Sequence, residues 1–449
     1  MLEPDGSEVG AEKNVEPGRD YFANGAPAQH PFAVLYQGEW ETEHDGNAFA
    51  VRKHALALSA TGIPVILKSF SNVVIGPYGI PEPVPVVGLP ALVRKEIRGL
   101  NMTSAGVTVP MIKHMVVPSA EKLTRAIMRG VVGPLETPEL LMAAQALAYQ
   151  MTIVYSVWER SSITDLVARH LAQVAENWVP CEQNAELLRA HGVKRVHVIP
   201  HPYNPTDDIC KLTRRQPHTD GWRLFYSIGK WEPRKGYDAL IGAFLRAFLP
   251  KEKVVLTIKH SRGSWKDYPT PAESVAKWLE APAVRRNGWT AERLERRLVL
   301  VEKNLPRSKI IELHYRNNIY VSSSHGEAWG LPAFEAKLAG NSLVHVTYGG
   351  TRDFADKSDP MVRYTLGEVP VSYGWEPGSL WAEYELGSLM AALVTATVPS
   401  KFERPAGFEA RFSMASVGRL MRDRVMEIAD RIHPRAADYY RQAARVELP

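Results

Sequence analysis

Two glutamates around a helix start form the pattern in this 449-residue chain that is best suited to chemistry. In the stretch HGEAWGLPAFEAKLAG, Glu327 lies in a loop and Glu335 lies in the helix that is expected to follow. Gly330 precedes that helix, whose first backbone amides lack intrahelical partners and attract a phosphate. Pro332 is tolerated in the first turn, where its missing N–H would have no partner. Carboxylates on both sides of such a site can hold uncharged hydroxyls, such as those of a sugar.

A second loop offers the positive charge that a diphosphate requires. Trp222 to Ile228 is expected to form a buried strand, and it runs into the sequence GKWEPRKG at residues 229–236. Lys230 and Lys235, five positions apart across this loop, can contact a diphosphate at two points. The alternative is an exposed basic turn without a ligand.

Both loops resemble motifs of the large retaining glycosyltransferase family with GT-B fold, the family 4-like group that carries an E-x7-E signature. That family reads roughly E-G-F/W-G-L-P-x-x-E-A-x-A-x-G, which residues 327–340 match as EAWGLPAFEAKLAG. Its phosphate loop reads G-R-L-x-x-x-K-G. Lys235 matches the lysine of that loop, and Lys230 stands where arginine is usual. The resemblance extends from about residue 31 to residue 432, with its sharp motifs at 229–236 and 325–350.

The resemblance implies a nucleotide-diphospho-sugar donor, with UDP or GDP as the nucleotide. In the family, the two cations neutralise the diphosphate, the first glutamate orients sugar hydroxyls, the second binds the ribose, and a Gly-Gly turn lies over the phosphates. No cofactor is expected. Metal independence is also expected, because lysine takes over the role of a metal and no D-x-D cluster ends a strand. Transferred residue by residue, the donor-binding set is Gly229, Lys230, Lys235, Glu327, Trp329, Gly330, Leu331, Glu335, Gly349 and Gly350.

The elements of the first half must present the acceptor side. Pro31–Gly38 is predicted to be a strand and Asn47–Ala60 a helix. Between them lie Asp45 and Gly46, in the loop that faces the cleft in the family. An ordinary connecting loop is an equally good interpretation of these two residues.

Two further acceptor-side candidates follow from predicted strands. Met151–Val157 is expected to be a strand, and Glu159 just beyond it matches a W/F-E pair found in a subgroup of the family. A helix cap or an ion-pair partner is the alternative for this carboxylate. His114 lies in the predicted strand Val107–Val117, where a lone histidine is more often structural. The catalytic set is therefore Glu327, Lys235, Lys230 and Glu159.

Length and composition indicate a two-domain globular protein. A chain of 449 residues is longer than a single hydrophobic core usually supports. Its composition, with 45% hydrophobic and 23% charged residues, is typical of a soluble globular protein. The fold class is α/β: two Rossmann-like doubly wound domains that face a central cleft, with a C-terminal helix crossing back to the first. The expected parts are a flexible leader at 1–30, an acceptor domain at 31–205, a linker at 206–221, a donor domain at 222–405 and the returning helix at 406–449.

Charge and cysteine content leave other functions open. A net charge of +5 is compatible with an anionic ligand, and an arginine cluster at 285–297 is interpreted as a solvated helix face.

The alternatives to a glycosyltransferase with an ordinary acceptor are a nucleotide-sugar-binding protein without transfer activity and a transferase that modifies a protein or a nucleic-acid base. The acceptor, whether glycan, lipid, protein or modified DNA base, is not specified. Two cysteines without a motif, and no signal peptide or transmembrane segment, favour a cytoplasmic protein.

Overall fold

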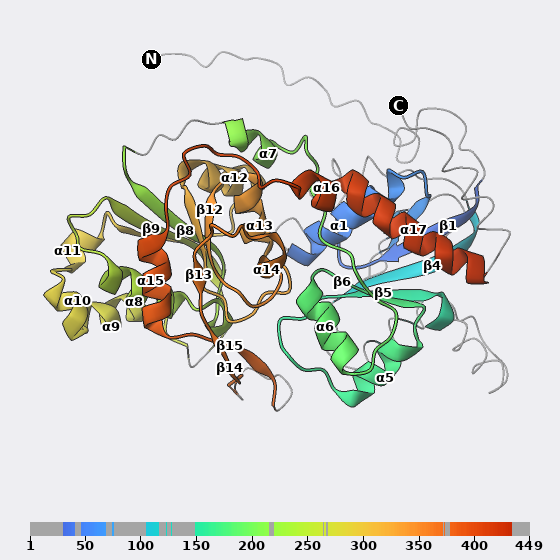
Figure 1. Ribbon diagram of the computed structural model, residues 1–449, viewed down its shortest axis with the longest axis horizontal. Coiled ribbons are helices and arrows are strands. Elements are labelled where there is room, and N and C mark those ends of the chain that lie inside the picture. The colour runs from blue at the N-terminus through green and yellow to red at the C-terminus, as the bar shows by residue number, and fades with distance from the viewer. Residues whose placement is uncertain are drawn as a thin grey trace, which may run out of the picture.

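Two α/β lobes lie side by side in the computed structural model of this chain (Figure 1). The structure describes residues 30–40, 46–68, 74–75, 105–115, 123, 127, 149–214, 220–263, 265, 268–370, 372 and 378–432. Each lobe is built around its own sheet, so we name them the first lobe and the second lobe in chain order. Among these residues no helix is long and apolar enough to span a bilayer.

The first lobe contains a seven-stranded sheet in the order β3-β2-β1-β4-β5-β6-β7. Its strands pair in parallel except for the antiparallel pair β2 and β3. Buried apolar residues occupy both faces of the central strands, as parallel sheets covered by helices require. The strands are β1 His30–Gln37, β2 Val65–Lys68, β3 Val74–Ile75, β4 Ala105–Met115, β5 Thr152–Ser156, β6 Glu176–Val179 and β7 Val196–Val198.

The described helices of the first lobe are α1 Gly46–Ser59, α5 Asp165–Gln173 and α6 Glu182–Ala190. Thr164 caps α5, because its hydroxyl accepts a hydrogen bond from the amide of Val167 at 3.2 Å. The strand and the helix predicted at the start of the chain are present as β1 and α1, and the strand β2 follows them.

The second lobe contains a six-stranded parallel sheet in the order β10-β9-β8-β11-β12-β13. A separate antiparallel hairpin is formed by β14 and β15. The strands are β8 Arg223–Trp231, β9 Val254–Arg262, β10 Leu298–Glu302, β11 Ile319–Ser322, β12 Ser342–Val346, β13 Met361–Val362, β14 Thr365–Glu368 and β15 Leu380–Glu383. The order reverses at β8, so β8 and β11 border a topological switch point, where ligands bind in folds of this kind.

Helices connect these strands. The helix α9 Pro271–Glu280 begins with a capping box: Thr270 Oγ1 accepts from the Glu273 amide at 3.2 Å, and Glu273 Oε2 accepts from the Thr270 amide at 2.7 Å. A 3-10 turn, η3 Pro233–Lys235, leads from β8 into α8. The helices are α8 Tyr237–Ala247, α9 Pro271–Glu280, α10 Pro282–Arg286, α11 Ala291–Leu294, α12 Arg307–Arg316, α13 Leu331–Leu338, α14 Thr351–Phe354 and α15 Leu386–Thr395.

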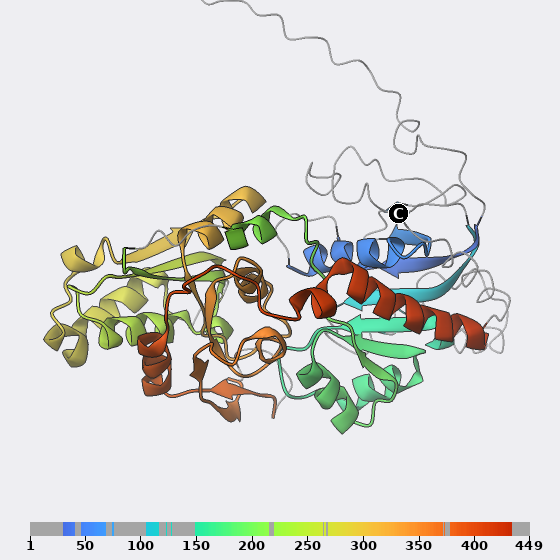
Figure 2. The ribbon, with the colours of Figure 1, turned by 45° about the horizontal axis from the view of Figure 1, so that its top comes forward.

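Two connections join the lobes. The first carries α7 Asp208–Lys211 and η2 Leu212–Arg214. The second runs through α16 Phe408–Phe412 into α17 Met414–Ile432, which lies along α1 of the first lobe in both views (Figures 1 and 2). The side chains of Met421, Val425 and Ile428 are fully buried in the core of the first lobe. The C-terminal helix therefore crosses back, and the predicted fold class is confirmed.

Candidate functional site

Lys235 and Glu327, 92 positions apart in the chain, are in direct contact. Lys235 ends the turn η3 after β8, and Glu327 lies in the loop between β11 and α13. The Lys235 ammonium donates a hydrogen bond to Glu327 Oε1. Gly229 makes room for this lysine, since a Cβ at Gly229 would lie 3.4 Å from Lys235 Cε and 2.5 Å from the Tyr237 hydroxyl. The structure thus joins the two loops that the sequence selects.

Glu327 is a partly buried carboxylate that stays ionised. Burial raises its pKa, but the cations of Lys235 and Arg234 outweigh this effect, and the net pKa is below the ordinary value. Its second oxygen lies 3.6 Å from Arg234 Nη1. A carboxylate has about four acceptor sites and an ammonium has three donors. Both groups therefore retain capacity for a ligand.

Arg234 and Glu232 are site residues that the sequence analysis missed. Arg234 Nη2 lies 2.7 Å from Glu232 Oε1 and 3.0 Å from Glu159 Oε1. Both missed residues lie inside the loop at 229–236, at positions that the family motif leaves unspecified. The only sequence feature that could have indicated them is the carboxylate of Glu232 two positions before Arg234, and such a spacing is too common to identify a site.

Lys230 lies on β8, where its backbone pairs with Ser261. Its side chain is exposed, and within the part of the chain that the structure describes it has no hydrogen-bond or ion-pair partner. It is therefore not held in the cluster around Arg234. Its predicted contact with a diphosphate remains a prediction.

The start of α13 has the geometry that the sequence indicates. Gly330 adopts the left-handed conformation with φ +84°, which turns the chain sharply into the helix. Leu331 faces the first lobe: its Cδ1 would lie 3.3 Å from a Cβ at Gly46. Trp329 is buried, and its ring packs 5.2 Å from Phe334. Among the predicted donor residues, Trp329 can therefore offer its backbone rather than its indole.

Glu335 is paired within the protein. Arg307 Nη1 lies 2.6 Å from Glu335 Oε1, and His314 Nε2 lies 3.5 Å from Oε2. Burial raises the pKa of Glu335, but Arg307 and His314 outweigh it and lower that pKa to about 2. Arg307 also lies over the ring of Phe49 from the first lobe, at 5.4 Å. The sequence analysis missed Arg307, and the ribose contact of Glu335 remains a prediction.

The Gly349–Gly350 turn packs against the Glu327 loop. The Gly350 amide donates to the Glu327 carbonyl at 2.9 Å, and a Cβ at Gly349 would lie 1.9 Å from that same oxygen. The Gly349 amide donates to Gln183 Oε1 of the first lobe at 2.5 Å. In this structure the two glycines therefore support the loop that carries Glu327, and their contact with phosphates remains a prediction.

Of the acceptor-side candidates, Glu159 reaches the site. It follows β5, and Gly326 of the second lobe packs on its backbone, because a Cβ at Gly326 would lie 2.2 Å from the Glu159 carbonyl. Gly46 begins α1 opposite Leu331. Asp45 lies outside the described residues. His114 pairs with Tyr155 through the backbone of β4 and β5, and its side chain lies outside the described part.

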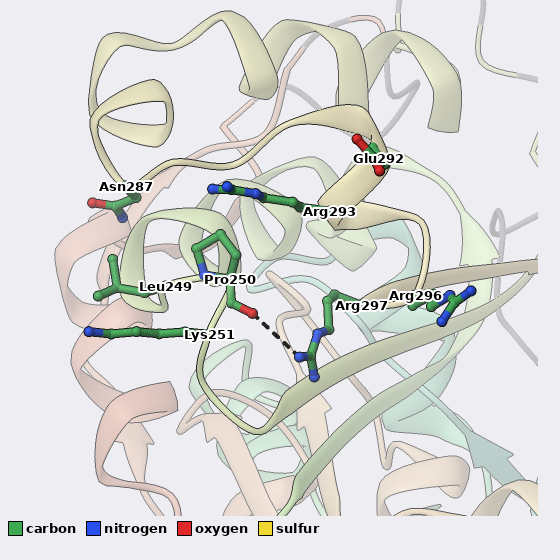
Figure 3. A pocket seen from close by; sticks show the side chains of 8 residues that line it. All are labelled: Leu249, Pro250, Lys251, Asn287, Glu292, Arg293, Arg296 and Arg297. Atoms are coloured by element: carbon green, nitrogen blue, oxygen red, sulfur yellow. Dashed lines mark hydrogen bonds between the residues drawn. The ribbon is translucent and has the colours of Figure 1, made fainter.

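A basic hollow of about 530 Å³ lies elsewhere in the second lobe (Figure 3). Its lining residues belong to the segments before β9 and β10, which include α11, whereas Lys235 and Glu327 follow β8 and β11. In a parallel sheet, the amino and carboxyl ends of the strands lie at opposite edges. The hollow is therefore separate from the site. It is lined by Leu249, Pro250, Lys251, Asn287, Glu292, Arg293, Arg296 and Arg297.

No group of three or more histidine, cysteine, aspartate or glutamate side chains among the described residues could hold a metal ion. Metal independence of the reaction remains a prediction.

Comparison with known proteins identifies the fold. No protein-family model matches the sequence, and no curated protein matches it significantly. HepE from Anabaena, in complex with UDP and glucose, superposes with a TM-score of 0.54 at 13% identity, covering 89% of this chain and 100% of HepE. The lipopolysaccharide outer core galactosyltransferase WaaB superposes with a TM-score of 0.51 at 12% identity, covering 88% of this chain and 99% of WaaB. The chain therefore has the GT-B fold of these glycosyltransferases.

Proposed function

We propose that this protein is a retaining glycosyltransferase that moves a sugar from a nucleotide-diphospho-sugar to an acceptor hydroxyl. The observation that carries the proposal is the contact between Lys235 and Glu327 at the start of α13, with Glu159 of the first lobe opposite. The structures of HepE with UDP and with UDP-glucose support a nucleotide-sugar donor for this fold. The acceptor and the sugar are left unspecified.

The donor diphosphate is the group that the site must stabilise most. As the sugar–phosphate bond breaks, negative charge develops on the departing phosphate, and a fixed cation nearby lowers the barrier. Lys235 and the exposed Lys230 supply that charge, together with the first amides of α13. Glu327 accepts hydrogen bonds from the donor-sugar hydroxyls, and Glu335 with Arg307 faces the ribose.

The configuration of the anomeric carbon is retained because the reaction takes place on its front face. The acceptor oxygen forms its bond to the anomeric carbon on the face from which the phosphate leaves, and the phosphate takes the acceptor proton. Glu327 is a poor covalent nucleophile because Lys235 holds its charge. Glu159 accepts a hydrogen bond from the acceptor hydroxyl. Lysine rather than a metal neutralises the phosphate, so EDTA leaves turnover unchanged.

The first test is a thermal-shift screen against UDP, GDP and their sugars. A ligand at 100 times its Kd stabilises the folded state by about 2.7 kcal/mol, which raises the melting temperature. Donor turnover is then measured for Lys235→Ala and Glu327→Gln. We expect about 100-fold lower turnover in Lys235→Ala, the loss typical of removing one group that stabilises developing charge. Turnover should also fall in Glu327→Gln, because the amide is a weaker acceptor for the donor-sugar hydroxyls and no longer pairs with the charge of Lys235.

The matched control is Lys251→Ala, which removes a lysine of the same lobe at the basic hollow (Figure 3). It should keep wild-type turnover. Near-normal turnover in Lys235→Ala with an unchanged circular dichroism spectrum would remove the proposal.

A further inference from the structure

The Arg234 guanidinium links the two lobes at the site. Within the second lobe its Nη1 donates to the Gly326 carbonyl at 2.6 Å, and its Nη2 donates to Glu232 Oε1 at 2.7 Å. Across the junction, Nη2 lies 3.0 Å from Glu159 Oε1. One side chain therefore contacts the acceptor-side carboxylate and the loop that carries Glu327.

The burial of Arg234 requires these partners. Its side chain is only 9% exposed. A buried charge is tolerated only where ion pairs and hydrogen bonds replace its water shell. The planar fork of arginine has five donors, so it can serve several acceptors at once, which the single ammonium of lysine cannot do in this geometry. Arg234 is therefore occupied by protein groups, in contrast to the exposed Lys230.

The backbone of Arg234 fixes the same loop. Its carbonyl accepts from the His325 amide at 2.7 Å and from the Ser324 hydroxyl at 3.1 Å. The absence of a side chain at Gly326 then lets the Glu159 backbone approach closely. The main chain and the side chain of Arg234 thus together fix the position of Glu159 relative to Glu327.

We propose that Arg234 is a positioning residue for sugar transfer, which holds Glu159 of the first lobe opposite Glu327 of the second so that acceptor and donor groups meet. This role rests on the proposed function and goes beyond it, because the ion pair between Arg234 and Glu159 would align the donor with the acceptor. Arg234 contacts neither substrate and acts through Glu159.

The electrostatics of Glu159 supply a readout that a merely structural role would not give. The side chain of Glu159 is 39% exposed, and its partial desolvation raises the pKa of the carboxyl. Arg234 and Lys235 work against that rise, whereas Glu327 and Glu232 add to it. Among the described residues, these four charged side chains of the second lobe act most strongly on Glu159. Removing the positive charge of Arg234 raises the pKa of Glu159 further. The acid limb of the kcat profile should then move to higher pH.

The experiment compares Arg234→Gln, Glu159→Gln and the double variant in the full-length protein, with donor turnover measured from pH 5 to pH 9. We expect kcat to fall at least ten-fold in Glu159→Gln with less than a three-fold change in donor KM. The double variant should be no slower than Glu159→Gln alone, because Arg234 acts through Glu159 and has no further effect once that carboxylate is removed. Arg234→Gln should shift the acid limb to higher pH, and Glu159→Gln should remove that limb.

Ser162→Ala is the matched control. Its hydroxyl lies 2.7 Å from the Ser379 hydroxyl across the same junction, without a charge. It should retain kcat within about two-fold, which separates alignment by Arg234 from general contact between the lobes. Multiplicative losses in the double variant, or an acid limb that does not move in Arg234→Gln, would overturn the inference.

Failure of the proposed function has a different signature. If the wild type turns over no nucleotide sugar and none shifts its melting temperature, the proposed function fails. The wild type, Arg234→Gln, Glu159→Gln and the double variant are then compared by urea unfolding. Non-additive changes in the unfolding midpoint would show that Arg234 and Glu159 interact. Without transfer activity that interaction has no role in transfer, so the inference is overturned in that case too.

Discussion

Charged side chains at the lobe junction neutralise one another, and their pairing sets their protonation. Glu335 is the clearest case, since Arg307 Nη1 lies 2.6 Å from one of its carboxylate oxygens and the side chain is only 10% exposed. An ionised carboxylate is tolerated there only because the guanidinium is present. The same reasoning applies to Glu327 beside Lys235.

At the residue scale, the pairing of Glu335 predicts a pH dependence of stability. Its pKa falls from an ordinary 4.5 to about 2 on folding. A depressed pKa stabilises the fold above the ordinary value, and this contribution is lost as pH falls from about 4.5 to about 2. The wild type should therefore lose about 2 kcal/mol more unfolding free energy than Glu335→Gln between pH 6 and pH 3, measured by urea unfolding.

Glu295→Gln, at an exposed position, is the control for this measurement. It should follow the wild-type curve. Parallel pH dependences in the wild type and Glu335→Gln would show that the Arg307 pair does not stabilise the folded state.

At the scale of elements, close backbone approaches hold the site loops in place. The loop between β11 and α13 contacts Gly349 and Gly350 on one side and Glu159 on the other, and a Cβ at Gly349 would collide with the backbone. Gly349 also has φ +96°, where residues with a Cβ are strained. The glycines of the turn are thus required by packing in this structure.

Gly349→Ala should therefore destabilise the protein by about 2 kcal/mol or more and lower donor turnover, because the added methyl displaces the Glu327 carbonyl. Urea unfolding and a turnover assay measure the two effects. Gly387→Ala in α15 is the control, since its Cβ would meet nothing within 4 Å. That change should be neutral or stabilising by up to about 1 kcal/mol. Equal effects at both positions would refute the packing argument.

At the scale of the whole molecule, α17 follows the second lobe in sequence but packs on the first lobe. It packs on α1, where a Cβ at Gly418 would lie 2.2 Å from the Ala57 carbonyl, so the two helices cross in close contact. The second lobe is thereby tied to the first by a helix whose apolar face is buried, as well as by the ion pairs of the junction.

Met421→Ala tests this tie. The side chain is fully buried, and truncation should cost about 2–5 kcal/mol of unfolding free energy through lost transfer energy and the remaining cavity. Leu420→Ala, at the adjacent position that is 40% exposed, should cost much less. The comparison is made by urea unfolding at pH 7. A similar loss in both variants would mean that α17 does not pack on the first lobe as described.

The sequence by itself determined the local features of this protein. Alternating strands and helices indicated the α/β fold class, and glycine next to charged residues marked the loops at 229–236 and 325–350. These features depend on neighbouring residues, because a turn, a cap or a strand is set by local backbone chemistry. The contact of Lys235 with Glu327 also follows once both loops are placed at the carboxyl ends of parallel strands.

Only the tertiary structure decided which charges meet. Arg234 pairs with Glu159 across the junction, Arg307 pairs with Glu335, and Gln183 accepts from the Gly349 amide. None of these partners has a fixed sequence spacing. The partners of Arg234 and of the Gly349 amide depend on how the two lobes pack together, and the pair of Arg307 with Glu335 depends on where α12 and α13 lie in the fold of the second lobe. Burial then makes the pairings obligatory, since a charge removed from water must find its partner wherever the packing places one.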